Sequence, residues 1–318
     1  MHRTICDNDA LEPIRTIDLA SALGAGVEEA TLAGRIATIG MCTGVLQRHA
    51  YWSFLDDQGF PGRHVHEAHP QAVAFLAHLD GRPVGAAALI PDSPLGLPLP
   101  EAFQPTIARL RRDGRQMALL DPLVIPAELD ARAAGLFMRA LLRLAILTAR
   151  RLDGRSDILV RCEPRFARFF AQVLLFTTDA EEPSAANGAP AQILLRLDLD
   201  LCPGEWLRLY GDGAWSPYGL HIRPSPQATR VIEWLRRHRQ PPSFHELVTT
   251  WIDPRDGSPP LDYDSFHRLR RLYPGLAEHL AIHHADPDGA RPARAAGTGP
   301  IPRIRTPLPW REDIAGSP

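Results

Sequence analysis

Residues 117–135 read MALLDPLVIPAELDARAAG, and this stretch decides the fold. An apolar run over 117–125 has the length of a buried strand, and it is followed by a loop that begins at Pro126. Small residues then open a helix whose pattern continues to Leu152, with an apolar stripe on one side and arginines on the other. A strand that leads into a long amphipathic helix predicts a mixed α/β domain.

Strand and helix patterns also alternate on both sides of this stretch. Asp80-Gly81 joins two short apolar runs and predicts a hairpin, because its turn needs a positive φ that Gly adopts without cost. The expected strands are 36–38, 72–78, 83–90, 117–125, 157–161 and 193–199. The expected helices are 19–23, 42–57, 101–112, 131–152, 164–175, 227–239 and 265–282.

These elements predict the α/β (α+β) class: a mixed central sheet flanked by helices, with a mainly helical C-terminal appendage. We expect a loosely ordered N-terminal arm over 1–32 and a main domain over 33–202. A small helical appendage follows over 203–285. Residues 286–318 are rich in Pro, Gly, Ala and Arg, so we expect disorder there, with a short docking element at 307–310.

Composition excludes several classes of function. With a net charge of −2, the chain has no overall positive potential that would attract nucleic acid. The 318 residues contain no Lys, which excludes catalysis through a lysine Schiff base and a phosphate-binding loop with its Lys. The four Cys form no C-x-x-C pair, which fits a reducing cytoplasm. The sequence contains no run of 18 apolar residues, so no membrane-spanning helix is expected. No metal site is expected, because 66–69 (HEAH) is read as loop surface and His283, His284 and Asp286 fall where order fades.

Two segments are candidates for ligand contact on physical grounds alone. The start of the long helix leaves backbone N–H groups unpaired, so Arg132, Ala133, Ala134 and Gly135 are candidates to hold a phosphate. An ordinary strand-to-helix turn is the alternative. Tyr51, Trp52 and Phe54 form an aromatic side on the helix at 42–57, where they line an acyl tunnel or simply join the core.

Five segments occur in the order and spacing of a known family: VGAAALIPDS (84–93), GLP (96–98), LRRDGR (110–115), PLVI (122–125) and APAQILLRLD (189–198). With them, residues 35–200 resemble the FeeM-type N-acyl amino acid synthases, which have the GNAT acyltransferase fold. The resemblance implies transfer of a fatty acyl group from acyl carrier protein, or from coenzyme A, to the amine of an amino acid. The co-substrate is then an acyl-phosphopantetheine thioester, and no tightly bound cofactor is expected.

The resemblance also implies roles for named residues. In this fold the strand at 117–125 supplies the backbone N–H for the thioester oxyanion, which here falls on Leu123, Val124 and Ile125. The helix with Tyr51, Trp52 and Phe54 borders the acyl pocket, and we expect Phe170 to contact substrate as well. A basic run of Arg109, Arg111, Arg112 and Arg115 is expected to attract the acidic carrier protein, with a solvated helix end as the alternative.

The sequence departs from the family at three positions. Leu119 stands where relatives carry a strand Glu, and Phe166 and Phe170 stand where they carry His and Tyr. Asp121 shares a face with Leu119 if the strand is regular, so it is the provisional base. Two functions remain open: an N-acyltransferase, or a degenerate GNAT-fold protein that binds acyl thioesters or carrier protein in a regulatory role.

Overall fold

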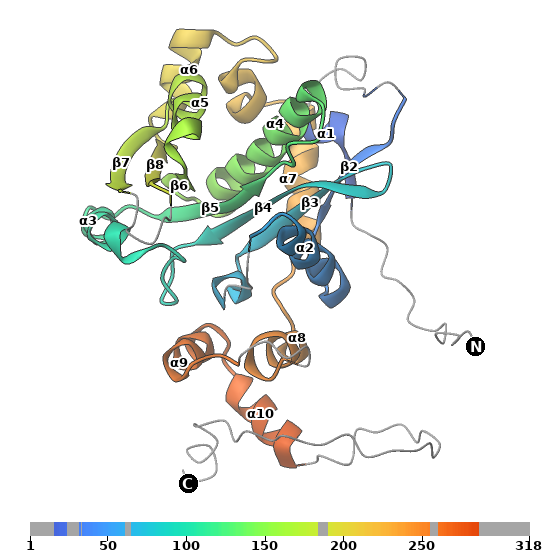
Figure 1. Ribbon diagram of the computed structural model, residues 1–318, viewed down its shortest axis with the longest axis vertical. Helices are drawn as coiled ribbons and strands as arrows, with labels where there is room; N and C mark the ends of the chain where they lie inside the picture. Colours follow the sequence, from blue (N-terminus) through green and yellow to red (C-terminus); the bar gives the residue numbers. More distant parts are fainter. Residues whose placement is uncertain are drawn as a thin grey trace. The chain divides into compact units, whose positions relative to one another are not determined.

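The computed structural model describes residues 16–23, 32, 34–60, 65–183, 190–254 and 260–285. Within them, eight strands form one sheet in the order β1-β2-β3-β4-β5-β6-β8-β7 (Figure 1). The strands are β1 (Thr16–Asp18), β2 (Ala37–Met41), β3 (Val73–Leu79), β4 (Arg82–Pro91), β5 (Met117–Val124), β6 (Asp157–Cys162), β7 (Thr177–Glu182) and β8 (Gln192–Asp198). Neighbours are antiparallel except β5 and β6, which are parallel. The expected mixed sheet is confirmed.

Helices cover both faces of this sheet. In Figure 1, α2 and α4 lie on opposite sides of the central strands. The α-helices are α1 (Leu19–Leu23), α2 (Val45–Asp57), α3 (Gln104–Arg112), α4 (Ala131–Leu147), α5 (Pro164–Leu174), α6 (Cys202–Tyr210), α7 (Pro226–His238), α8 (Phe244–Leu247), α9 (Tyr263–Leu272) and α10 (Leu276–Ala285). A π-helical turn over Thr148–Leu152 continues α4, so the helix expected over 131–152 is confirmed.

The hairpin of β3 and β4 has the turn that its sequence predicts. Asp80 and Gly81 both have positive φ, 52° and 77° respectively. This is the geometry of a two-residue turn that matches the twist of the strands.

Replacement of Gly81 by Ala is therefore expected to lower the free energy of unfolding by about 1 kcal/mol, because a Cβ is disfavoured at this φ. Urea-induced unfolding measures the change. Gly135→Ala is the matched control, since Gly135 lies inside α4 with no atom within 4 Å of an added Cβ, and Ala favours the helix. Equal stabilities for the two variants would contradict the turn assignment.

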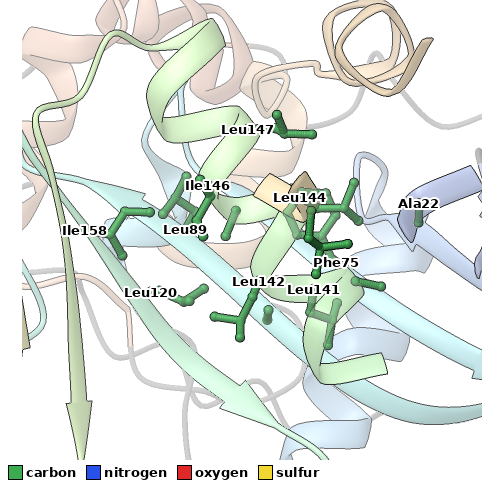
Figure 2. Packing of buried hydrophobic residues seen from close by; sticks show 14 of the residues in the cluster. Ala22, Phe75, Leu89, Leu120, Leu141, Leu142, Leu144, Ile146, Leu147 and Ile158 are labelled. Atoms are coloured by element: carbon green, nitrogen blue, oxygen red, sulfur yellow. The ribbon is translucent and has the colours of Figure 1, made fainter. Parts of the chain in front are cut away.

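The main core lies between α4 and one face of the sheet. Alternate residues of β5, Ala118 and Leu120, point toward α4, as the period of a strand requires. Figure 2 shows the α4 side chains Leu141, Leu144 and Ile146 packed with the strand residues Phe75, Leu89, Leu120 and Ile158. Burial of a leucine of this kind stabilises the fold by about 2 kcal/mol.

Leu119 belongs to a second core on the other face of the sheet. This α3-side core consists of Ile90, Leu97, Leu99, Phe103, Ile107, Leu110, Met117, Leu119, Leu159 and Leu194. Leu119 is fully buried among these apolar side chains. The position at which the resemblance implies a strand carboxylate is therefore a packing position here.

The chain divides into two compact units, and the division differs from the expected one. The first unit continues to Pro241 and includes α6 and α7, because Trp206 and Leu235 are fully buried in the main core. The second unit comprises residues 68–70 together with those from Pro242 onward. In it, Phe266 and Leu269 of α9 are buried. The appendage expected after residue 202 thus begins about 40 residues later.

Three further expectations concern the ends of the chain. Of the expected N-terminal arm, residues 16–23 are described, and they form β1 and α1, with Leu19 and Leu23 buried in the main core. The docking segment at 307–310 and the side chains of His283, His284 and Asp286 lie outside the described residues. Among the described helices, none has the length and apolar character that crossing a bilayer requires.

Candidate active site between strands β5 and β6

The parallel strands β5 and β6 separate halfway along their length. Their pairing runs from Met117 and Asp157 to Leu120 and Val160, and it ends there. Beyond this point, among the strands that the structure describes, β5 pairs only with β4 and β6 only with β8. The facing edges therefore present backbone groups that no strand satisfies, and such groups need a ligand or water as partner. We call this opening the β5–β6 gap.

Asp121 and Arg161 lie at the closed end of the β5–β6 gap. Their side chains form an ion pair of 2.9 Å across it, and the carboxylate is 13% exposed. Burial raises the pKa of Asp121 to about 6, although the charge and hydrogen bond of Arg161 oppose this rise. An Asp with this pKa is ionised at neutral pH and is well matched to accept a proton.

The strand is irregular at Asp121. Between the pairs Leu120–Leu89 and Leu123–Ala87, β5 has one residue more than β4, which is a β-bulge. The bulge includes Pro122, whose peptide bond with Asp121 is cis. Strict alternation from Leu119 therefore does not decide where Asp121 points, and its charge acts on Tyr51 of α2.

The predicted oxyanion donors follow the bulge directly. Successive N–H groups of a strand point to opposite edges, so one of the Leu123 and Val124 amides is directed toward the β5–β6 gap. Pro122 has no N–H to offer. Ile125 follows the strand, and its side chain covers Gly85, where an added Cβ would lie 2.7 Å from Ile125 Cδ1. The role of these amides stays a prediction.

The start of α4 borders a surface hollow of about 410 Å³. Its lining residues are Ala131, Arg132, Gly135, Leu136, Arg139 and Trp215. The Asp130 carboxylate caps the helix by accepting a hydrogen bond from Ala133 N–H at 2.9 Å. The Ala134 N–H donates to the Asp130 carbonyl. Of the predicted phosphate cradle, Arg132 and Gly135 face the hollow, whereas the amides of Ala133 and Ala134 are engaged.

The aromatic side of α2 divides between two environments. Phe54 lines a second hollow of about 560 Å³ with Val84 and Leu129 among its other lining residues. Tyr51 and Trp52 are buried away from solvent. Their polar atoms meet Glu67 in the 3₁₀ turn Val65–Ala68.

Glu67 is the residue of this region that sequence reasoning missed. The expectation of loop surface is wrong for it, because Glu67 is 4% exposed. Trp52 Nε1 donates a hydrogen bond to Glu67 Oε2 at 2.7 Å, and Tyr51 Oη lies 3.5 Å from Oε1. Burial raises the pKa of Glu67 to about 7, and the charge of Asp121 adds to the rise. A single carboxylate in a polar stretch gives no sequence signal of burial.

The remaining predicted contacts lie elsewhere. Phe170 is buried in the main core and packs edge-to-face on Phe176, with ring centroids 5.2 Å apart. Phe166 is half exposed on α5, and the Arg165 guanidinium lies over its ring. Contact of Phe170 with a substrate stays a prediction.

Three of the four arginines of the expected basic surface are in ion pairs. Arg111 pairs with Asp92, and Arg109 pairs with Asp113 and Asp179. Arg115 contacts the carboxylates of Asp157, Asp198 and Asp200. Neutralised side chains attract an acidic partner weakly, so the charge available for docking here is small.

Together, the mixed sheet, the flanking helices and the separation of its two parallel strands give the first unit a GNAT-like fold. The family model of the N-acyl amino acid synthase FeeM matches residues 55–198. This match confirms the resemblance that the sequence motifs indicate, and it supports N-acyltransferase activity. No curated protein matches the chain.

Solved structures of acyltransferases are similar to this chain at low sequence identity. FeeM from uncultured soil microbes is 17% identical, with a TM-score of 0.49, and the match covers 57% of this chain and 100% of that one. An N-acetyltransferase from Staphylococcus aureus Mu50 is 13% identical, with a TM-score of 0.35 and coverage of 52% and 98%. A putative acetyltransferase from Salmonella typhimurium, solved with acetyl-CoA, is 18% identical, with a TM-score of 0.29 and coverage of 50% and 76%.

Proposed function

We propose that this protein is an N-acyltransferase that moves a fatty acyl group from a thioester to the amine of an amino acid. The observation that carries the proposal is the β5–β6 gap with the carboxylate of Asp121 at its closed end. The unpaired strand edges offer hydrogen-bonding groups to the extended phosphopantetheine arm. The family match over residues 55–198 supports the same reaction.

The chemistry follows from the groups at the gap. The ammonium of the amino acid must lose a proton before the amine attacks the thioester carbon, and ionised Asp121 accepts that proton. The carbonyl oxygen then carries negative charge, which the Leu123 or Val124 amide stabilises. Attack forms the C–N bond, and collapse of the intermediate restores the C=O bond and breaks the C–S bond. The second proton of the attacking nitrogen ends on the departing sulfur, so the products are the amide and the thiol.

The Asp121–Arg161 ion pair supports an amino acid as acceptor. An α-amino acid carries an ammonium and a carboxylate, and the pair offers one partner of opposite charge for each. Arg161 is 30% exposed, so its guanidinium is accessible from solvent. A guanidinium also binds a carboxylate with two parallel hydrogen bonds, which fixes the orientation of the acceptor.

The donor in this proposal is acyl carrier protein or acyl coenzyme A. The hollow at the start of α4, with Arg132 and Arg139 among its lining residues, is the proposed place for the phosphate of the donor arm. The negative charge of Asp130 at the same helix start opposes a phosphate there, so the two arginines must compensate for it.

One observation favours the alternative of a binding protein without catalysis. Leu119 is packed in the α3-side core, and Asp121 is already paired with Arg161, so the strand carboxylate of the family has no direct equivalent. In that case the protein retains an acyl thioester in the β5–β6 gap and releases it unchanged.

Mass spectrometry of organic extracts tests the two functions. Bacteria that express the wild type are expected to accumulate N-acyl amino acids that are absent from empty-vector cells and from an Asp121→Asn, Gly135→Trp double variant. Soluble wild-type protein without such lipids would contradict the enzyme. Native mass spectrometry that detects a bound acyl thioester would then support the binding protein.

The proposed phosphate site in the hollow at the start of α4 can be tested separately. Gly135→Trp fills it, so the KM for the acyl donor is expected to rise about tenfold, which is a loss of about 1.4 kcal/mol of binding. Steady-state kinetics with purified protein measures this. Gly204→Trp is the matched control, because Gly204 is also helical and open, on α6. An unchanged KM in Gly135→Trp would place the donor elsewhere.

A further inference from the structure

Helix α5 presents a stripe of large apolar side chains to solvent. Phe166, Phe169 and Val173 are spaced three and four residues apart, so they lie on one face of the helix. They are between 41% and 49% exposed, whereas Phe170 and Leu174 on the neighbouring face are buried in the main core. A contiguous set of exposed apolar side chains marks a site of contact with a protein or a membrane.

The end of α6 extends this stripe. The Tyr210 hydroxyl donates a hydrogen bond to the Gln172 carbonyl at 2.6 Å, which places the C-terminal end of α6 beside α5. Leu207 and Tyr210 are one turn apart on α6, and both are exposed. Figure 1 shows α5 and α6 as neighbours next to β6 and β8. We call the following residues the α5–α6 patch: Phe166, Phe169, Val173, Leu207 and Tyr210.

Arginines line one edge of the α5–α6 patch. The Arg165 guanidinium lies over the Phe166 ring, 4.8 Å from its centroid, and Arg168 follows one turn later. Arg165 also pairs with Glu163, but both side chains are exposed, and a pair of this kind is weak. Within the part of the chain that the structure describes, Arg168 contacts no carboxylate, and its guanidinium donates to the Gln172 side chain. The edge therefore offers cations beside an apolar surface.

We propose that the α5–α6 patch attaches this protein peripherally to an anionic lipid surface. Its apolar side chains enter the boundary between headgroups and acyl chains, and the arginines at its edge bind headgroup phosphates. A two-fold dimer through the same patch would bring Arg165 and Arg168 of both copies together, and like-charge repulsion disfavours that contact. The net charge of −2 opposes anionic lipid, so attachment depends on this local charge and on the apolar contact.

The position of α5 relates this attachment to the candidate site. β6 ends at Cys162 and α5 begins at Pro164, so the helix starts at the open end of the β5–β6 gap. The product of the proposed function has a fatty chain and a carboxylate, and an amphiphile of this kind partitions into a bilayer. A lipid surface at this position receives the product as it leaves the gap. The attachment goes beyond the proposed function and needs no turnover.

Vesicle flotation with the purified full-length protein tests the proposal. The wild type is expected to bind mixed phosphatidylglycerol and phosphatidylcholine vesicles at least about tenfold more tightly than vesicles of phosphatidylcholine alone. A Phe166→Ser, Phe169→Ser double variant is expected to bind the mixed vesicles at least about tenfold more weakly than the wild type. Leu46→Ser is the matched control, because Leu46 is 66% exposed on α2, on the other face of the sheet. Circular dichroism should be unchanged, since the replaced side chains are exposed.

Charge reversal gives a second readout. An Arg165→Glu, Arg168→Glu double variant is expected to lose the preference for phosphatidylglycerol, because its patch repels the headgroups. Arg82→Glu combined with Arg112→Glu makes the same change in net charge at two exposed arginines on other elements. This control should keep the preference of the wild type.

Three outcomes would overturn the attachment. The first is a wild type that floats with neither kind of vesicle, and the second is equal binding by the wild type and the phenylalanine variant. The third is a wild-type dimer in sedimentation velocity that the phenylalanine variant converts to monomer, since the patch would then belong to a second copy. Absence of N-acyl amino acids from the extracts would instead remove the proposed function and leave the attachment standing.

Discussion

Replacement of Asp121 by Asn is expected to lower kcat/KM about 10²- to 10⁴-fold, the usual contribution of a general base. The amide has the size of the carboxyl, so the bulge and the contact with Arg161 can persist while the proton acceptor is lost. The loss should appear with alkyl and aryl thioesters alike, because proton removal from the amine precedes departure of the thiolate. Steady-state kinetics with both donors measures it.

The same role for Asp121 predicts how kcat/KM changes with pH. In the wild type, kcat/KM is expected to fall as the pH drops through about 6, because protonated Asp121 cannot accept a proton. Asp121→Asn should lack this fall. A kcat/KM for Asp121→Asn within threefold of the wild-type value would contradict the assignment of Asp121 as the general base.

Loss of activity in this variant should not come from unfolding. The folded-state pKa of Asp121 lies above its ordinary value of 3.8, so the folded protein binds the proton more tightly than the unfolded chain does. Stability from this group is therefore present at low pH and is lost as the pH rises from about 4 to about 6. At pH 8 the neutral Asn avoids the cost of a buried charge, and a thermal melt is expected to show no decrease in Tm.

Replacement of Arg115 by Ala is expected to lower the free energy of unfolding by about 3 kcal/mol, because it removes the main partner of a buried charge. Arg115 binds Asp157 through two hydrogen bonds of 2.6 and 2.9 Å, and the Asp157 side chain is fully buried. Arg196 approaches Asp157 at 3.3 Å and compensates for part of the loss. Urea-induced unfolding measures the difference.

Arg112→Ala is the matched control for this prediction. Arg112 lies on the same run of sequence but is exposed at the end of α3, so its removal is expected to change stability by less than about 0.5 kcal/mol. Similar losses for the two variants would mean that the ion-pair network does not stabilise the fold.

The same network supports the candidate site. Asp157 begins β6, and its register partner Met117 begins β5, so the Arg115–Asp157 contact holds the two strands where their pairing starts. The pairing ends three residues later, at Leu120 and Val160, where the β5–β6 gap begins. Arg115, which the sequence offered as a docking group, is thus a structural residue.

Local patterns predicted most of the elements around the site. The hairpin depended on Asp80-Gly81, and α4 depended on an apolar stripe, both of which are properties of a few neighbouring residues. Strands without such a pattern were missed. β7 reads TTDAEE and lies at the edge of the sheet, where exposed strands need no apolar alternation.

The site itself was predicted only in part. The gap falls in the stretch 117–135 that the motifs singled out, and Asp121 lies at its closed end. The bulge at Asp121–Pro122 was not predictable, because it arises from pairing with β4 rather than from β5 alone. Glu67 was missed because its burial depends on aromatic side chains of a different element, Tyr51 and Trp52.

The sequence by itself determined the strand–helix order, the hairpin, the helix α4 and the family resemblance, since each depends on spacing along the chain. The tertiary structure decided which charged side chains are neutralised by a partner and which have a shifted pKa. Arg115 and Asp157 are 42 residues apart in the sequence and neutralise each other. Glu67 and Asp121 come from separate elements, and the charge of Asp121 adds to the rise in the pKa of Glu67. Charge and burial depend on neighbours in space, and for this reason the acid–base properties of the site followed only from the folded chain.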